Sequence, residues 1–202
     1  MITKKIASIF SFCLATLVAF LPFNYIVGSK IALFSYSSMA IPALGFQYSL
    51  VYVILYFFTK GLFTFVSPFL FLLHRLPLFF ATAALKKSDV RIFVGLPIAA
   101  MILFCIHPVG SQVFYYSWYW FIPMIIYFFV QDSLISRALA ASFIAHAVGS
   151  VVWLYTGHIS AEVWTALMPL VIVERLLIAV GMLGFIYLFR LIHSFSESKV
   201  VA

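Results

Sequence analysis

Seven long apolar runs constrain the fold of this chain more than any other feature. They are Ile6–Val27, Ile41–Thr59, Gly61–Leu85, Ile92–His107, Val113–Val130, Arg137–Thr156 and Val163–Leu191. A helix needs about 20 apolar residues to cross the hydrocarbon core of a bilayer. Only 8% of the residues are charged, against about 25% in a soluble domain. The sequence therefore predicts an all-α, polytopic transmembrane bundle that forms a single integral membrane domain over residues 1–202.

The third run, Gly61–Leu85, is interrupted twice. Ser67-Pro68 and His74-Arg75-Leu76-Pro77 divide it into two arms, each too short to cross the hydrocarbon core. We expect this run to enter the membrane and return as a broken or re-entrant hairpin, which leaves six full spans. The alternative is seven spans, with one terminus on the outer side.

The distribution of basic residues predicts the orientation. Lysine and arginine gather at Lys4-Lys5, Lys60, Lys86–Arg91, Gln131–Arg137 and the C-terminal tail. The intervening segments Gly28–Ala40, His107–Gln112 and Gly157–Glu162 hold only Lys30 and Glu162 as fixed charges. Basic loops of membrane proteins face the cytoplasm. We therefore expect a multi-pass protein of the cell membrane with both termini in the cytoplasm.

The first run also has features of a signal peptide, because a basic start precedes it. However, it continues to Val27 without a small-residue cleavage pattern, past the length of an ordinary signal core. We expect it to be retained as the first span.

Several chemistries find no support in the sequence. The net charge of +7 is explained by the basic loops, and no basic stripe interleaved with aromatic residues predicts nucleic-acid binding. Cys13 and Cys105 lie in apolar runs without metal-ligand spacing, and the spacing of His107, His146 and His158 is not diagnostic of a metal. No nucleophile elbow, phosphate loop or nucleotide motif occurs. We expect no metal and no cofactor.

Glu174 and Arg175 are adjacent charges in the middle of the last apolar run. Charges inside a membrane are rare and indicate function by default. Neighbouring residues on a helix point about 100° apart, so these two need not pair with each other. Glu174 could hold a cationic group or a proton, and Arg175 could meet a polar group on another helix. The alternative is a salt bridge that only fixes helix packing.

Aromatic residues gather at the ends that we place outside. They either anchor the helices at the interface or line an outward-facing pocket for a small, mostly neutral molecule. The apolar segment Lys30–Gln47, with a break at Pro42 and Gly45, could lie across the mouth or lead into the second span. The candidate substrate-binding residues are His107, Gln112, Tyr116, Trp120, His146, Trp153, Glu174 and Arg175.

This layout resembles the S-component, the substrate-binding membrane subunit of energy-coupling-factor vitamin transporters. Ala15 and Ala19 match the Ala-x-x-x-Ala of that family's first helix. The resemblance implies that these two alanines contact a transmembrane coupling subunit, that two ATPases complete the complex, and that an apolar loop closes over the substrate. The broken run Gly61–Leu85 departs from the family pattern.

Two other classes compete with a transport subunit. One is a non-catalytic helical accessory subunit of a larger membrane complex. The other is an intramembrane enzyme that uses histidine and glutamate. Because no convergent pair of catalytic residues is visible in the sequence, we expect the chain not to be an enzyme.

Overall fold

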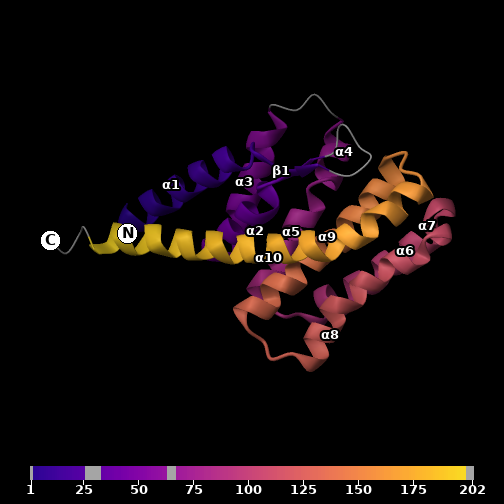
Figure 1. Ribbon diagram of the computed structural model, residues 1–202. Coiled ribbons are helices and arrows are strands. Elements are labelled where there is room, and N and C mark those ends of the chain that lie inside the picture. Colours follow the sequence, from indigo (N-terminus) through magenta and orange to yellow (C-terminus); the bar gives the residue numbers. More distant parts are fainter. Residues whose placement is uncertain (1, 26–32, 63–66, 199–202) are drawn as a thin grey trace.

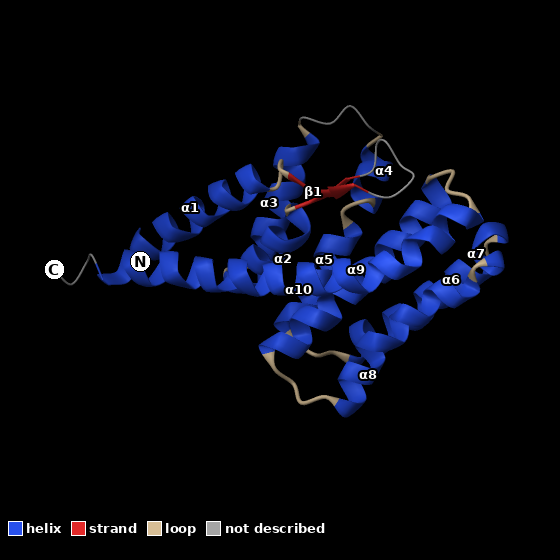
Figure 2. Ribbon diagram, in the orientation of Figure 1, coloured by secondary structure: helices blue, strands red, loops and turns tan. Residues whose placement is uncertain are grey.

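The computed structural model describes residues 2–25, 33–62 and 67–198, and it confirms a predominantly helical chain (Figures 1 and 2). A π-helix (Arg91–Gly95) leads into α6, and a 3-10 helix (Phe114–Trp120) leads into α8. A short antiparallel ribbon pairs β1 (Pro22–Tyr25) with β2 (Leu33–Ser35). The α-helices are α1 (Ile2–Val18), α2 (Ser37–Gln47), α3 (Leu50–Gly61), α4 (Pro68–Leu73), α5 (Leu76–Lys86), α6 (Leu96–Ile106), α7 (Pro108–Gln112), α8 (Phe121–Phe129), α9 (Leu134–Thr156) and α10 (Ala161–Ser198).

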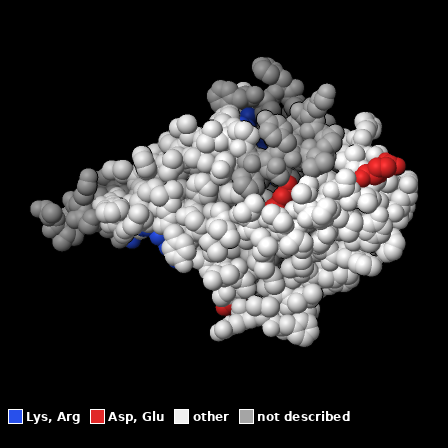
Figure 3. All heavy atoms as spheres, viewed as in Figure 1, with Lys and Arg blue, Asp and Glu red and all other residues white. Residues whose placement is uncertain are grey.

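Within the described residues, three helical segments are long and apolar enough to cross a membrane. They are Pro68–Lys86, which joins α4 and α5, Leu134–Thr156 and Ala161–Ser196. Large apolar side chains such as Leu17 and Val180 are 71% and 66% exposed, and the face shown in Figure 3 carries few charged atoms. Such a surface is compatible with a membrane location.

Helix α2 lies at the centre of the molecule and has no polar face. Its residues from Met39 to Gly45 are all buried, as expected for a helix that is apolar on all sides. It packs against α1, α3, α5 and α10. Gly45 permits this close packing, because a Cβ atom there would lie 2.5 Å from the Cγ2 atoms of both Thr82 and Val53.

The second apolar run, Ile41–Thr59, forms two helices rather than one. Ser49 is extended (φ −169°, ψ 154°), and its hydroxyl accepts a hydrogen bond from the Val51 amide at 3.3 Å, so it caps α3. Pro42 and Gly45, where we expected the break, lie inside α2. The chain reverses instead at Tyr48 and Ser49.

Contacts with α1 show that α2 and α3 form a hairpin. The Tyr36 amide, just before α2, donates to the Leu21 carbonyl near the end of α1. The Tyr52 hydroxyl, near the start of α3, donates to Ser8 Oγ at 2.6 Å. At the other end of α3, the Lys60 ammonium lies 3.3 Å from the centroid of the Phe20 ring. Helix α2 therefore runs antiparallel to α1, and α3 runs back beside it.

The structure differs from the expected hairpin within Gly61–Leu85. His74 (φ −69°, ψ −7°) and Arg75 (φ −98°, ψ −14°) both keep right-handed helical backbone. The chain therefore kinks between α4 and α5 without reversing, and Pro68–Lys86 forms one interrupted helix. The physical reason is that Pro77 lies in the first turn of α5, where a helix tolerates a missing amide hydrogen.

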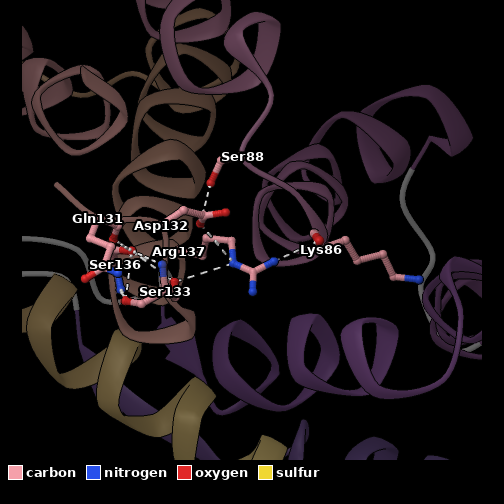
Figure 4. A network of polar contacts seen from close by, with 7 residues as sticks. All are labelled: Lys86, Ser88, Gln131, Asp132, Ser133, Ser136 and Arg137. Carbon is pink, nitrogen blue, oxygen red and sulfur yellow. Dashed lines mark hydrogen bonds and ion pairs between the residues drawn. The ribbon is translucent and has the colours of Figure 1, made fainter. Parts of the chain in front are cut away.

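A polar network joins the end of α5 to the start of α9 (Figure 4). The Ser88 hydroxyl donates to Asp132 Oδ1 at 2.8 Å, and Arg137 Nε lies 3.4 Å from the same oxygen. Arg137 Nη1 also donates to the Lys86 carbonyl at 2.9 Å. Two basic loops that we expected on one side of the membrane therefore lie together.

The C-terminal ends of α6 and α9 also lie together. The Tyr155 hydroxyl donates to the Leu103 carbonyl at 2.8 Å, and the rings of His107 and Tyr155 lie 4.9 Å apart. The segments that follow α6 and α9, both expected on the outer side, therefore share one end of the molecule.

The packing of Gly45 predicts that Gly45→Ala destabilises the protein by about 1–3 kcal/mol, since overpacking forces α3 or α5 to shift. Thermal unfolding of the protein in detergent measures this loss. Gly184→Ala is the matched control, because a Cβ atom at Gly184 meets nothing within 4 Å. Equal melting temperatures for the two variants would contradict the close packing of α2.

Candidate functional site

A cavity of ≈ 570 Å³ lies between α2, α4–α5, α9 and α10. Its lining extends from Ser35, Leu70 and Ile159, near the ends of their segments, to Ile178 in the middle of α10. Most lining side chains are apolar or aromatic, and a few polar groups converge among them. This volume and lining are typical of a small-molecule site.

Glu174 and Arg175 line the cavity and form an ion pair with each other. Glu174 Oε2 lies 3.5 Å from Arg175 Nη2, and the two residues are 9% and 3% exposed. The sequence left open whether these neighbours pair, and the structure brings them together within one turn of α10. Because the pair faces a cavity rather than lipid, its burial is less costly.

His146 of α9 and the aromatic residues around it form one wall. His146 is 7% exposed, and its Nε2 atom has no hydrogen-bond partner among the described residues. Its ring lies 5.4 Å from that of Tyr116, which in turn packs 4.9 Å from Trp164. The indole Nε1 of Trp164 is buried and likewise lacks a partner within the described part of the chain. Buried polar atoms of this kind are normally satisfied, and a ligand or water in the cavity would satisfy them.

The kink between α4 and α5 supplies another part of the lining. His74 Nδ1 is hydrogen-bonded to the Leu70 carbonyl at 2.7 Å, and Nε2 lies 3.3 Å from Thr156 Oγ1. The His74 ring also packs 5.0 Å from Trp153. These contacts attach the kink to the end of α9 and hold His74 and Arg75 at the cavity.

The structure brings together five of the eight residues predicted to bind substrate. Tyr116, His146, Trp153, Glu174 and Arg175 all line the cavity. These five residues come from three separate segments of the chain, namely the 3-10 helix before α8, α9 and α10.

The other three predicted residues do not line this cavity. His107 begins α7, where its Nδ1 accepts a hydrogen bond from the Val109 amide at 3.2 Å, and it borders a separate hollow. Gln112 is exposed and donates to the Pro108 carbonyl at 2.9 Å. Trp120 is 0% exposed and packs 5.3 Å from the Phe104 ring. The sequence located these three residues along the chain, but it could not show which way their side chains face.

Sequence reasoning missed several lining residues, above all His74 and Arg75. Their signal was present, because an arginine at membrane depth requires protein or water around it. The predicted hairpin accounted for the break in the run without assigning a role to these two side chains. Ser35 and Ser37 also line the cavity, and they belong to the segment that we expected near its mouth.

Ala15 and Ala19, predicted to contact a coupling subunit, are 0% and 2% exposed. They belong to the main cluster of buried apolar residues, because α1 packs its small side chains against α2 and α10. In this conformation the chain's own helices cover them.

The chain has no recognisable relative, and its described residues form no metal centre. Among the residues that the structure describes, no group of three or more His, Cys, Asp or Glu could hold a metal ion. No protein-family model, curated protein or solved structure matches the chain. The cavity is therefore the feature of the molecule that bears most directly on its function.

The buried ion pair predicts that Glu174→Gln destabilises the protein by about 3 kcal/mol, because it leaves Arg175 buried without its carboxylate. Thermal or denaturant unfolding in detergent measures this change. Glu162→Gln is the matched control, since Glu162 is exposed at the start of the same helix. A Glu174→Gln variant as stable as the control would show that the pair contributes nothing to folding.

Proposed function

We propose that this chain is an integral membrane subunit that binds a small organic molecule in the cavity for transport. The observation that carries the proposal is the composition of the cavity lining. Only 8% of the residues in this chain are charged. The buried pair Glu174–Arg175 and the kink residues His74 and Arg75 nevertheless lie around one cavity. His146 lines the same cavity, and its Nε2 atom has no hydrogen-bond partner among the described residues.

A purely structural ion pair explains this arrangement less well. Such a pair needs dense packing around it, because a void removes favourable contacts from every atom that lines it. Here the pair borders ≈ 570 Å³ of open volume. A binding site requires such a volume, and the aromatic residues Tyr116, Trp153 and Trp164 on its walls suit an organic ligand.

The proposed topology has six spans and one re-entrant hairpin. The spans are α1, α4–α5, the segment ending with α6, the segment ending with α8, α9 and α10. Helices α2 and α3 have 11 and 12 residues, or about 17 Å each, so neither reaches across about 30 Å of hydrocarbon. The re-entrant hairpin is therefore Ser37–Gly61 in place of Gly61–Leu85.

This topology keeps both termini in the cytoplasm and changes the side assigned to Lys60. Lys60 lies against Phe20, just past the end of α1, so it belongs to the outer side if Lys4 and Lys5 are inside. The inner side still holds Lys86, Lys87 and Arg137, in agreement with the positive-inside rule. The cavity then opens toward the outside, where Ser35 and Ile159 lie.

Cysteine labelling tests the topology. In a background without Cys13 and Cys105, we expect Leu62→Cys and Ser111→Cys to react with a membrane-impermeant maleimide from the outer side of intact cells. We expect Ser88→Cys to react only after the cells are opened. Labelling of positions 62 and 88 from the same side would reject the hairpin at Ser37–Gly61.

A transport role requires a source of energy, and the resemblance to S-components suggests a coupling subunit with two ATPases. Because Ala15 and Ala19 are covered, we propose that the exposed face of α1, which includes Ile9, Phe10 and Leu17 at 58%, 58% and 71% exposure, makes the partner contact. Co-purification from native membranes tests this partnership. A monomer that carries no small molecule would contradict the transport proposal.

Filling the cavity tests binding directly. We expect Gly149→Leu to remove the co-purifying small molecule and keep the fold, because a Cβ atom at Gly149 meets only Pro77 Cγ, at 3.5 Å, and a longer side chain extends into the cavity. Mass spectrometry of compounds extracted from the purified protein measures this loss. Gly184→Leu, in open space on α10, should retain the compound. Equal retention by both variants would reject this cavity as the binding site.

A further inference from the structure

The fixed charges of the described residues around the cavity do not balance. Among these residues the lining contains three fixed charges: Arg75, Glu174 and Arg175. Glu174 and Arg175 neutralise each other at 3.5 Å. Arg75 therefore leaves one positive charge without a counter-charge among the described residues, on the wall of a largely apolar cavity.

Two other carboxylates that the structure describes have their partners elsewhere. Asp132 pairs with Arg137 at the far end of α9, and Asp89 accepts a hydrogen bond from the Arg91 amide at 2.9 Å. Among the described side chains, no carboxylate forms an ion pair with Arg75. The buried Nε of Arg75 has no hydrogen-bond partner in the described part of the chain, and its guanidinium carbon lies 5.0 Å from the Phe71 ring centroid.

We propose that Arg75 binds the carboxylate of a monoanionic ligand, an inference that rests on the proposed function of the cavity. A guanidinium presents paired N–H donors that match the two oxygens of a carboxylate. A carboxylate restores neutrality, whereas a doubly charged phosphate would leave an excess negative charge in an apolar space. The remaining lining, including Trp153, Leu167 and Val171, suits an apolar or aromatic body. The ligand class is therefore an organic acid with one carboxylate.

The test compares matched acids and amides that differ only in charge. The probes are phenylpropionate, indole-3-propionate and 2-naphthoate, each with its primary amide, added to the purified protein in detergent. Binding is followed by thermal stabilisation and by the fluorescence of Trp153 and Trp164, which line the cavity. For the wild type, we expect at least one acid to bind about tenfold more tightly than its amide, because charge-assisted hydrogen bonds form only with the acid.

Three variants assign the preference to Arg75. Arg75→Gln should bring the acid and the amide to similar affinities, and Arg75→Lys should restore part of the preference for the acid through charge alone. Arg190→Gln is the matched control and should keep the preference in full. Arg190 makes a comparable contact with an aromatic ring, 5.8 Å from Tyr187, but lies exposed and far from the cavity.

The outcomes separate this inference from the proposed function. Equal binding of acids and amides by the wild type, or a preference that survives Arg75→Gln, overturns the role of Arg75 and leaves the binding cavity intact. Failure of every probe to bind, with no compound extracted from the native protein, overturns the proposed function itself. Extraction of a phospholipid, lost on Gly149→Leu, would replace the organic acid with a lipid phosphate and reject the carboxylate assignment.

Discussion

A charged group in the apolar part of this protein is stable only where protein or water surrounds it, and the helix arrangement meets this requirement. Glu174 and Arg175 lie in the middle of α10, a helix that is otherwise apolar. Helices α2, α4–α5 and α9 enclose that part of α10 and leave a cavity beside the pair. In the proposed membrane location, the charges are thereby kept from lipid without being packed into a dry core. The same enclosure places His146 and Arg75 on the walls of the space.

Small residues make this enclosure possible. Apolar burial drives helix association weakly inside a bilayer, so close backbone approach and interhelical hydrogen bonds hold the bundle together. Gly45 lets α2 reach α3 and α5, and Gly149 of α9 faces Pro77 of α5. At the turn of the central hairpin, the Tyr48 hydroxyl is hydrogen-bonded to Ser11 at 3.0 Å and donates to the Phe189 carbonyl at 3.4 Å. One polar side chain thus connects the hairpin to both α1 and α10.

Composition and run length were enough to predict the helical class, and charge placement correctly grouped the loops joined by Ser88, Asp132 and Arg137. The position of the hairpin was not predicted, because Pro77 looked like a stronger break than Tyr48 and Ser49. A proline in the first turn of a helix lowers helix stability little. A serine that caps a new helix can instead divide one apolar run into two helices. Of the site, the residues on α9 and α10 that face inward were predicted. Trp120 and Gln112 were predicted to bind substrate but do not line this cavity, because side-chain direction depends on packing that no single run reveals.

The central position of the α2–α3 hairpin has a consequence for the biogenesis of the protein. Residues 37–61 leave the ribosome long before the helix that covers them, since Tyr48 and Phe189 are 141 residues apart. In the proposed topology the hairpin is too short to span, so it has no stable place in lipid until α5 and α10 have been synthesised. In that topology it docks only after α10 has been made. Truncation of the chain before α10 would leave the apolar helix α2 without one of the helices that cover it.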